Sequence, residues 1–210
     1  MTEYEYKLNN SLYPLISKIH KLNILEFGVQ RGRSTLKLLD ICKKNDGFLF
    51  SADIDDCSDV SKDPRWTFIK SRDDNFDLIK SKIPKKVDVI FLDSLHEAVH
   101  VEKIIYNYFD LLNKDGYFFI DDISHLPYLK NKNSNSFYCE INNKETFNKI
   151  LEIYDNNSNL FDLNFSFISS GLAIIKKKSN LPLNKGHRIV TRENSFKNIV
   201  RLLWKIFKKN

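Results

Sequence analysis

The feature that most constrains the fold of this chain is a series of short apolar runs that alternate with segments of helical spacing. The runs lie at residues 23–27, 48–53, 66–70, 87–92 and 117–120. Runs that are apolar on both faces are typical of parallel strands, because helices cover both faces of such a sheet. The sequence therefore predicts β-α-β units that form a doubly wound α/β domain.

The connecting segments complete the expected order of elements. Two further runs, 164–169 and 172–175, flank Ser170-Gly171 and predict an antiparallel hairpin at the sheet edge. We therefore expect a mostly parallel, seven-stranded sheet. The polar segment 127–143 is expected to be a loop that forms part of a substrate lid. Helices are expected at 12–22, at 73–83 before Pro84, at 98–112, at 144–154, and from Thr35 onward with Ser34 as the N-cap.

Charge is distributed unevenly along the chain. Residues 176–210 contain 11 Lys and Arg and one acid, whereas residues 1–175 contain 22 basic and 26 acidic residues. A uniformly basic surface for nucleic acid is therefore not expected. The three cysteines form no C-x-x-C pair, and neither a signal peptide nor a membrane-spanning run is evident. These features predict a cytoplasmic protein with reduced thiols.

Acidic residues cluster at the ends of the predicted strands. Glu26, Asp53, Asp93, Asp121 and Asp122 each lie at the end of an apolar run or directly after it. In an open parallel sheet, ligands bind beyond the carboxyl ends of the strands. Because a buried carboxylate is costly unless it has a partner, these acids predict one shared ligand cleft.

The turn after the first strand reads Glu26-Phe-Gly28-Val-Gln-Arg-Gly32-Arg-Ser34-Thr35. It matches neither the dinucleotide-binding glycine pattern nor a phosphate-binding loop. The glycines let the backbone approach a ligand, and Glu26 repels phosphate but favours an ammonium group. Since Asp53 can accept two ribose hydroxyls, the pattern suits a cationic nucleoside that lacks phosphate.

This run resembles motif I of the class I S-adenosylmethionine-dependent methyltransferases, and the resemblance extends over about residues 20–178. It implies a Rossmann-like fold in which Glu26 faces the methionine ammonium through the loop and Asp53 holds the ribose. Ser71, Arg72 and Asp73 stand where the family contacts the adenine, although Lys70-Ser71 replaces its common glycine. A nicotinamide-binding domain and a non-binding relative are the alternatives. The expected cofactor residues are Glu26, Gly28, Gly32, Ser34, Asp53, Ser71, Asp73 and Asp93.

The second half of the expected cleft contains Asp93-Ser-Leu-His96 and then Asp121-Asp122. This pattern resembles the macrocin-type O-methyltransferases and the related cephalosporin-hydroxylase-like group, although the first acid of the pair is often Glu there. The resemblance implies that Asp93, Asp121 and Asp122 bind a divalent metal such as Mg²⁺ and that His96 is the general base. In the alternative, Asp93 acts without metal. His125 is a second candidate base, and His100 is expected to be a surface residue.

The end of the chain is expected to lie outside the catalytic domain of residues 1–179. Residues 180–193 are expected to form a linker, and 195–208 a basic amphipathic helix with Lys197, Arg201, Lys205 and Lys208 on one stripe. Two interpretations stay open for this helix. Its apolar face packs on the domain or on a second subunit of a homo-oligomer, or it attaches to a membrane surface.

Together, these features predict an O-methyltransferase that acts on a hydroxyl of a sugar, a glycan precursor or a similar small molecule, and not on nucleic acid. S-adenosylmethionine is the expected cofactor, with a divalent metal assisting. Two alternatives remain. One is a metal-independent methyltransferase of another acceptor, and the other is a non-catalytic binding protein that keeps the fold.

Overall fold

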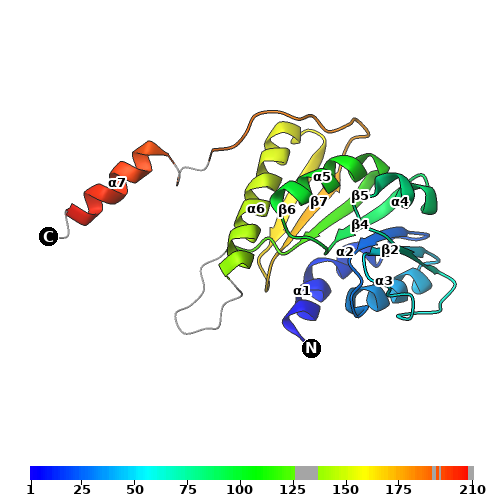
Figure 1. Cartoon of the computed structure of the whole chain (residues 1–210). Helices are drawn as coiled ribbons and strands as arrows, with labels where there is room; N and C mark the ends of the chain where they lie inside the picture. Colours follow the sequence, from blue (N-terminus) through cyan, green and yellow to red (C-terminus); the bar gives the residue numbers. More distant parts are fainter. Residues whose placement is uncertain (126–136, 191–192, 194, 208–210) are drawn as a thin grey trace.

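The chain folds around one seven-stranded sheet with helices on both faces (Figure 1). The computed structural model describes residues 1–125, 137–190, 193 and 195–207. The strand order is β3-β2-β1-β4-β5-β7-β6, and only β7 runs antiparallel to both of its neighbours. The strands are β1 Asn23–Phe27, β2 Phe48–Asp53, β3 Trp66–Lys70, β4 Val87–Leu92, β5 Leu112–Asp121, β6 Phe161–Ser166 and β7 Leu172–Lys177.

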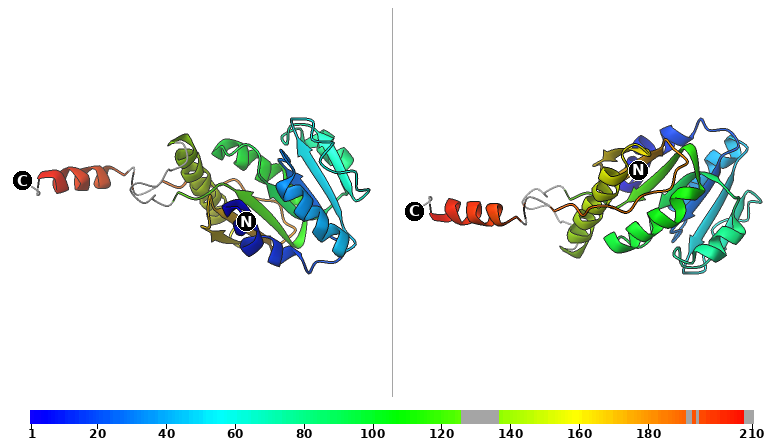
Figure 2. Two further views of the ribbon diagram at one scale, coloured as in Figure 1. Left: turned by 90° about the horizontal axis from the view of Figure 1, so that it is seen from below. Right: turned by 90° about the horizontal axis from the view of Figure 1, so that it is seen from above.

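Two apolar cores lie on the two faces of this sheet. Strand β4 contributes side chains to both cores, because successive side chains of a strand point to opposite faces of the sheet. Val89 and Phe91 join the core beneath the first three helices, while Ile90 and Leu92 join the core beneath the next three. Figure 2 views the sheet and its helices from two opposite sides. The helices are α1 Glu3–Ser11, α2 Tyr13–Ile16, α3 Arg33–Lys44, α4 Phe76–Lys82, α5 Ala98–Tyr108, the short 3₁₀ turn η1 Phe109–Leu111, α6 Phe137–Asn157 and α7 Phe196–Phe207.

The sheet has its topological switch point between β1 and β4. From β1 the chain moves outward to β2 and β3, and then returns to β4 on the other side of β1. The loops that follow β1 and β4 therefore diverge to opposite faces and leave a crevice at the carboxyl ends of these strands. The predicted doubly wound fold with an edge hairpin is confirmed, but β6 covers 161–166 and not 164–169, so the connection to β7 is longer than the expected tight turn.

The first helix begins earlier than expected. The segment 12–22 is not one helix, since α1 ends at Ser11, α2 ends at Ile16 and a turn follows. Thr2 and Glu5 form a reciprocal capping box that starts α1. Leu8, Leu12 and Ile16 then continue one buried stripe across both helices. The apolar spacing indicated the buried face correctly but not the helix start.

Three other expectations also change. Leu112 belongs to β5 and not to the preceding helix, because it pairs with Val87. Helix α6 begins at Phe137, so the part of the expected loop from 137 to 143 is helical, while 126–136 lie outside the described residues. The N-cap of α3 is Gly32 in a left-handed conformation, and Ser34 does not cap this helix.

Candidate active site

A cavity of about 710 Å³ lies at the carboxyl ends of the central strands. This volume lies within the usual range for small-molecule and cofactor sites. Most of the predicted site residues line it, and they come from the loops after β1, β2, β3, β4 and β5. The predicted residues on its wall are Gly28, Ser34, Asp53, Ser71, Asp73, Asp93, His96, Asp121 and Asp122; Glu26 and Gly32 are not among its lining residues.

The glycine turn is shaped by close backbone packing at the switch point. Gly28 has a φ of +94°, and a Cβ atom added there would lie 1.9 Å from the carbonyl oxygen of Asp93. Gly32 has a φ of +73°, and its added Cβ would lie 2.3 Å from a methyl group of Val60. Both positions therefore favour glycine, because each has a positive φ and lacks room for a Cβ atom, Gly28 against the Asp93 backbone and Gly32 against the Val60 side chain.

Glu26 lies beneath the turn and is fully buried. Its Oε1 accepts a hydrogen bond from Ser34 at 2.7 Å, and its Oε2 accepts from Thr35 at 2.8 Å and from Ser51 at 2.7 Å. Burial raises the pKa of this carboxyl to about 7 although the three hydroxyls oppose the shift. The Glu26 carboxylate thus links β1 to β2 and to the start of α3 through hydrogen bonds. Its expected interaction with the ammonium group of the methionine stays a prediction.

Asp53 lies at the end of β2 and faces the cavity. Its Oδ2 accepts the backbone N–H groups of Val29 at 2.7 Å and Gln30 at 3.0 Å. Burial alone would raise the pKa of Asp53, but these backbone donors outweigh burial and lower it. The carboxylate is therefore ionised and held rigidly, as an acceptor for ligand hydroxyls should be.

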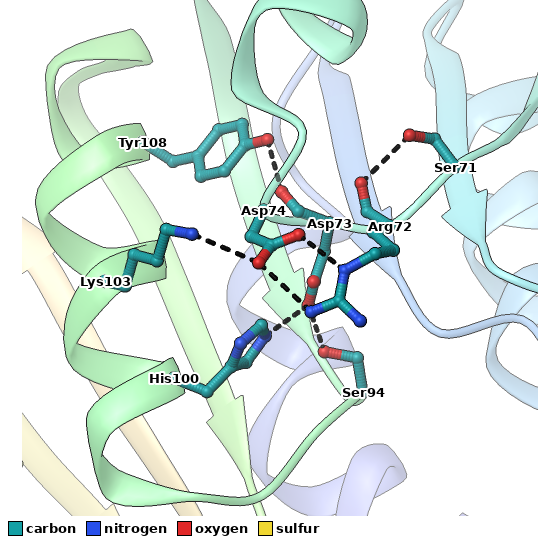
Figure 3. Close-up of polar contacts among 8 residues, drawn as sticks. All are labelled: Ser71, Arg72, Asp73, Asp74, Ser94, His100, Lys103 and Tyr108. Carbon is teal, nitrogen blue, oxygen red and sulfur yellow. Dashed lines mark hydrogen bonds and ion pairs between the residues drawn. The ribbon is translucent and has the colours of Figure 1, made fainter.

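Asp73 forms the centre of a buried polar network (Figure 3). Its Oδ2 accepts from the hydroxyl of Ser94 and pairs with His100 Nε2 at 2.8 Å, while its carbonyl oxygen accepts from Tyr108 at 2.6 Å. The expectation that His100 is a surface residue is wrong, because this bond holds its ring inside. The network ties the loop after β3 to the loop after β4 and to α5, which rigidifies one wall of the cavity.

A second cluster lies at the ends of β4 and β5. His96 Nε2 is 3.6 Å from Oδ1 of Asp93 and 3.5 Å from Oδ2 of Asp122. Burial raises the pKa of Asp93 to about 6, and the negative charge of Asp122 adds to this shift while the Tyr4 hydrogen bond opposes it. The structure therefore brings together the predicted base and two of the three predicted carboxylates.

Helix α1 contributes two residues that sequence reasoning missed. The Lys7 ammonium forms an ion pair with Asp121 and donates to the Ser170 hydroxyl at 2.7 Å, and both charged groups are buried. The Tyr4 hydroxyl donates to Oδ2 of Asp93 at 2.6 Å. Burial and the charge of Asp93 raise the pKa of Tyr4, so it remains a donor.

A signal for this helix was present in the sequence. Thr2-x-x-Glu5 is a capping-box pattern, and it places Tyr4 and Lys7 three residues apart on one helix face. The sequence therefore indicated that Tyr4 and Lys7 share one face of a helix. It did not indicate that this face contacts the ends of β4 and β5.

The predicted metal site stays a prediction, and the surroundings of its three carboxylates bear on it. Asp121 is already neutralised by Lys7, and the described residues hold no group of three His, Cys, Asp or Glu side chains arranged to bind a metal. Asp93 and Asp122 remain on the cavity wall. Two carboxylates with water suffice for Mg²⁺ in many sites. The donor chemistry of Asp93 and Asp122 therefore suits a divalent ion, whereas Lys7 competes with such an ion at Asp121.

The fold and the crevice define the class of protein. A seven-stranded sheet of this order, with an antiparallel β7 and a glycine turn after β1, is the class I methyltransferase fold. Residues 25–123 match a family model described as a methyltransferase domain. Residues 25–123 are therefore similar to a methyltransferase domain, and with the fold they confirm the resemblance to the class I methyltransferases seen in the sequence.

Solved structures agree on the fold. The SAH-bound methyltransferase PaMTH1 of Podospora anserina is 15% identical, with a TM-score of 0.60 over 75% of this chain and 72% of that chain. A proposed caffeoyl-CoA O-methyltransferase of Staphylococcus aureus is 18% identical, with a TM-score of 0.60 over 84% of both chains.

The MycE methyltransferase of the mycinamycin biosynthetic pathway, solved with Mg and SAH, is 16% identical, with a TM-score of 0.57. The match covers 90% of this chain but only 52% of that chain, so this chain spans about half of MycE. No curated protein matches the sequence.

Proposed function

We propose that this protein is an S-adenosylmethionine-dependent O-methyltransferase that acts on a hydroxyl of a sugar, a glycan precursor or a similar small molecule. The observation that carries the proposal is one cavity with two chemically different parts. An ionised, backbone-held Asp53 lies in one part, and His96 with Asp93 and Asp122 lies in the other. Such a cavity can hold a nucleoside cofactor beside an acceptor hydroxyl.

The first part of the cavity suits the cofactor. Asp53 would accept the ribose hydroxyls, and Ser71 and Asp73 on the same wall would contact the adenine. Arg31 and Arg33 also line the cavity and supply positive charge for the methionine carboxylate. PaMTH1 and MycE, which share the fold, were solved with SAH, the demethylated form of this cofactor, and this supports the assignment.

The second part suits proton removal from the acceptor. Bound S-adenosylmethionine would supply a methyl group to the acceptor hydroxyl, and the His96 imidazole would take the proton of that hydroxyl. Asp93 and Asp122 orient His96 and stabilise its protonated form, while Tyr4 fixes Asp93. A divalent ion bound by Asp93 and Asp122 would lower the pKa of the hydroxyl.

A metal-independent methyltransferase is the second candidate, and a specific observation favours it. Lys7 already places a positive charge at Asp121, where the resemblance implied a metal ligand. In this alternative, Lys7 and Tyr4 limit the repulsion among the acids, and His96 removes the proton without help from a metal.

Cofactor binding is tested first, by calorimetry with S-adenosylmethionine and its demethylated product. We expect both to bind, and we expect Asp53→Ala to weaken binding while Asp56→Ala does not, because Asp56 lies in the loop that follows β2 but outside the cavity lining. Preference for a nicotinamide cofactor would overturn the assignment.

Methyl transfer to a panel of hydroxyl acceptors tests the chemistry. His96→Ala should lower kcat by roughly a hundredfold or more, the usual contribution of a general base, with little change in cofactor affinity. His187→Ala is the matched control, since His187 lies outside the cavity lining. Loss of turnover on chelation would support the two-carboxylate metal site, and turnover that survives chelation would support the metal-independent candidate. Activity that survives both chelation and His96→Ala would refute the proposed mechanism.

A further inference from the structure

Helix α7 is the largest feature that the proposed function does not use. It lies apart from the α/β domain in all three views (Figures 1 and 2). None of its residues is buried, and the exposed fractions of Phe196, Trp204 and Phe207 are 80%, 64% and 75%. Contiguous exposed apolar surface of this kind marks an interaction site.

The helix has two sharply separated faces. At 100° per residue, the polar residues Lys197, Asn198, Arg201 and Lys205 fall within an arc of about 100°. The apolar residues occupy about 200° of the remaining circumference. They are Phe196, Ile199, Val200, Leu202, Leu203, Trp204, Ile206 and Phe207.

The domain is complete without this helix. Both apolar cores are built from elements that precede it, and no α7 residue belongs to either core. The charged side chains of α7 are all basic, in contrast to the slight acidic excess of residues 1–175. Lys208 and Lys209 follow it directly in the sequence. The occupant of the apolar face should therefore be apolar and edged with negative charge.

We infer that α7 binds in the surface of a membrane that contains anionic lipid. The broad apolar face, with Trp204 and two Phe residues, suits the boundary between headgroups and acyl chains, and the basic stripe suits anionic headgroups. Twelve residues extend only about 18 Å, too short to cross a bilayer. In the described part of the chain, no helix is long and apolar enough to do so. The helix therefore lies on the membrane and tethers the domain to it.

Vesicle sedimentation of the full chain tests this inference. The probes are phosphatidylcholine vesicles with and without one quarter phosphatidylglycerol. We expect binding only to the anionic vesicles and a fall in binding as salt rises. Each Lys or Arg near such a surface contributes about fivefold in affinity, so Lys197→Gln, Arg201→Gln and Lys205→Gln together should weaken binding roughly a hundredfold.

Two variants make the result decisive. A matched control replaces three exposed lysines of the domain, Lys18, Lys37 and Lys82, by Gln and should bind like the wild type. Leu203→Gln with Trp204→Gln should abolish binding while the thermal unfolding of the domain is unchanged. Equal vesicle binding by this apolar variant would overturn the inference. So would a dimer that forms without vesicles and dissociates in the apolar variant, because the apolar face would then bind a second copy.

Discussion

Lys7 offers a quantitative test of how α1 is joined to the site. Lys7→Met keeps the length and the apolar stem of the side chain but removes the ammonium group. At a pH above its raised pKa, Asp121, which is 1% exposed, would then carry its charge without its ion-pair partner, close to Asp93. The same reasoning applies in reverse to Asp121→Asn, which would leave the buried Lys7 ammonium without its carboxylate.

The expected loss follows from burial. Removing one partner of a buried ion pair costs about 3–5 kcal/mol of unfolding free energy, because the other charge stays in a medium of low polarity. An exposed pair contributes only about 0–1 kcal/mol. Lys44 and Asp40 form such a pair at 2.8 Å, with side chains 71% and 50% exposed, so Lys44→Met is the matched control. We expect the double variant Lys7→Met/Asp121→Asn to lose far less than the sum of its single variants, because neither charge remains.

The pH dependence gives a second check. Burial and the charge of Asp93 raise the pKa of Asp121, and Lys7 opposes this shift. Without Lys7 the folded-state pKa rises further above the unfolded value, so Asp121 contributes stability at low pH that is lost as pH rises through the folded pKa. The destabilisation by Lys7→Met should therefore be larger at pH 8 than at pH 5.

Urea unfolding monitored by circular dichroism measures these free energies, with an unchanged m-value as the sign that two-state unfolding is retained. Strictly additive losses in the double variant, or a single-variant loss below about 1 kcal/mol, would show that the pair is not the buried contact described above.

Two further predictions concern the glycine turn. Burial raises the folded-state pKa of Glu26 to about 7, so the native protein holds a proton that the unfolded chain releases, and wild-type stability should fall between pH 5 and pH 8. Glu26→Gln cannot exchange this proton. Between pH 5 and pH 8, urea unfolding should show that the free energy of unfolding of the wild type falls by on the order of 3 kcal/mol more than that of the variant. Equal pH dependence in both proteins would contradict the prediction. Gly28→Ala places a Cβ 1.9 Å from the Asp93 carbonyl oxygen at positive φ, so it should cost roughly 2 kcal/mol or more and lower Tm. An unchanged Tm would show that the ends of β1 and β4 are not this close.

Much of the fold could be predicted from the sequence because the relevant signals are local. Apolar runs such as 87–92 are long enough for one strand and are apolar on both faces, which requires a sheet covered by helices on both sides. Asp93, His96 and Asp122 could be assigned to one cleft because the ends of parallel neighbouring strands meet at one edge. The boundaries were less reliable, as Leu112 shows, because strand pairing and not local spacing decided its state.

Other features depended on the tertiary structure. Lys7 and Asp121 are separated by 114 positions, and no periodicity in the chain relates them. They meet because the stripe of Leu8, Leu12 and Ile16 packs α1 against the sheet, which brings the other side chains of α1 to the ends of β4 and β5. Glu26 was correctly placed at a strand end, but only the packing of β1, β2 and α3 decided that its carboxylate binds three hydroxyls. Sequence patterns report what a segment buries, whereas the partner of a buried polar group is decided by which distant segments the core brings together.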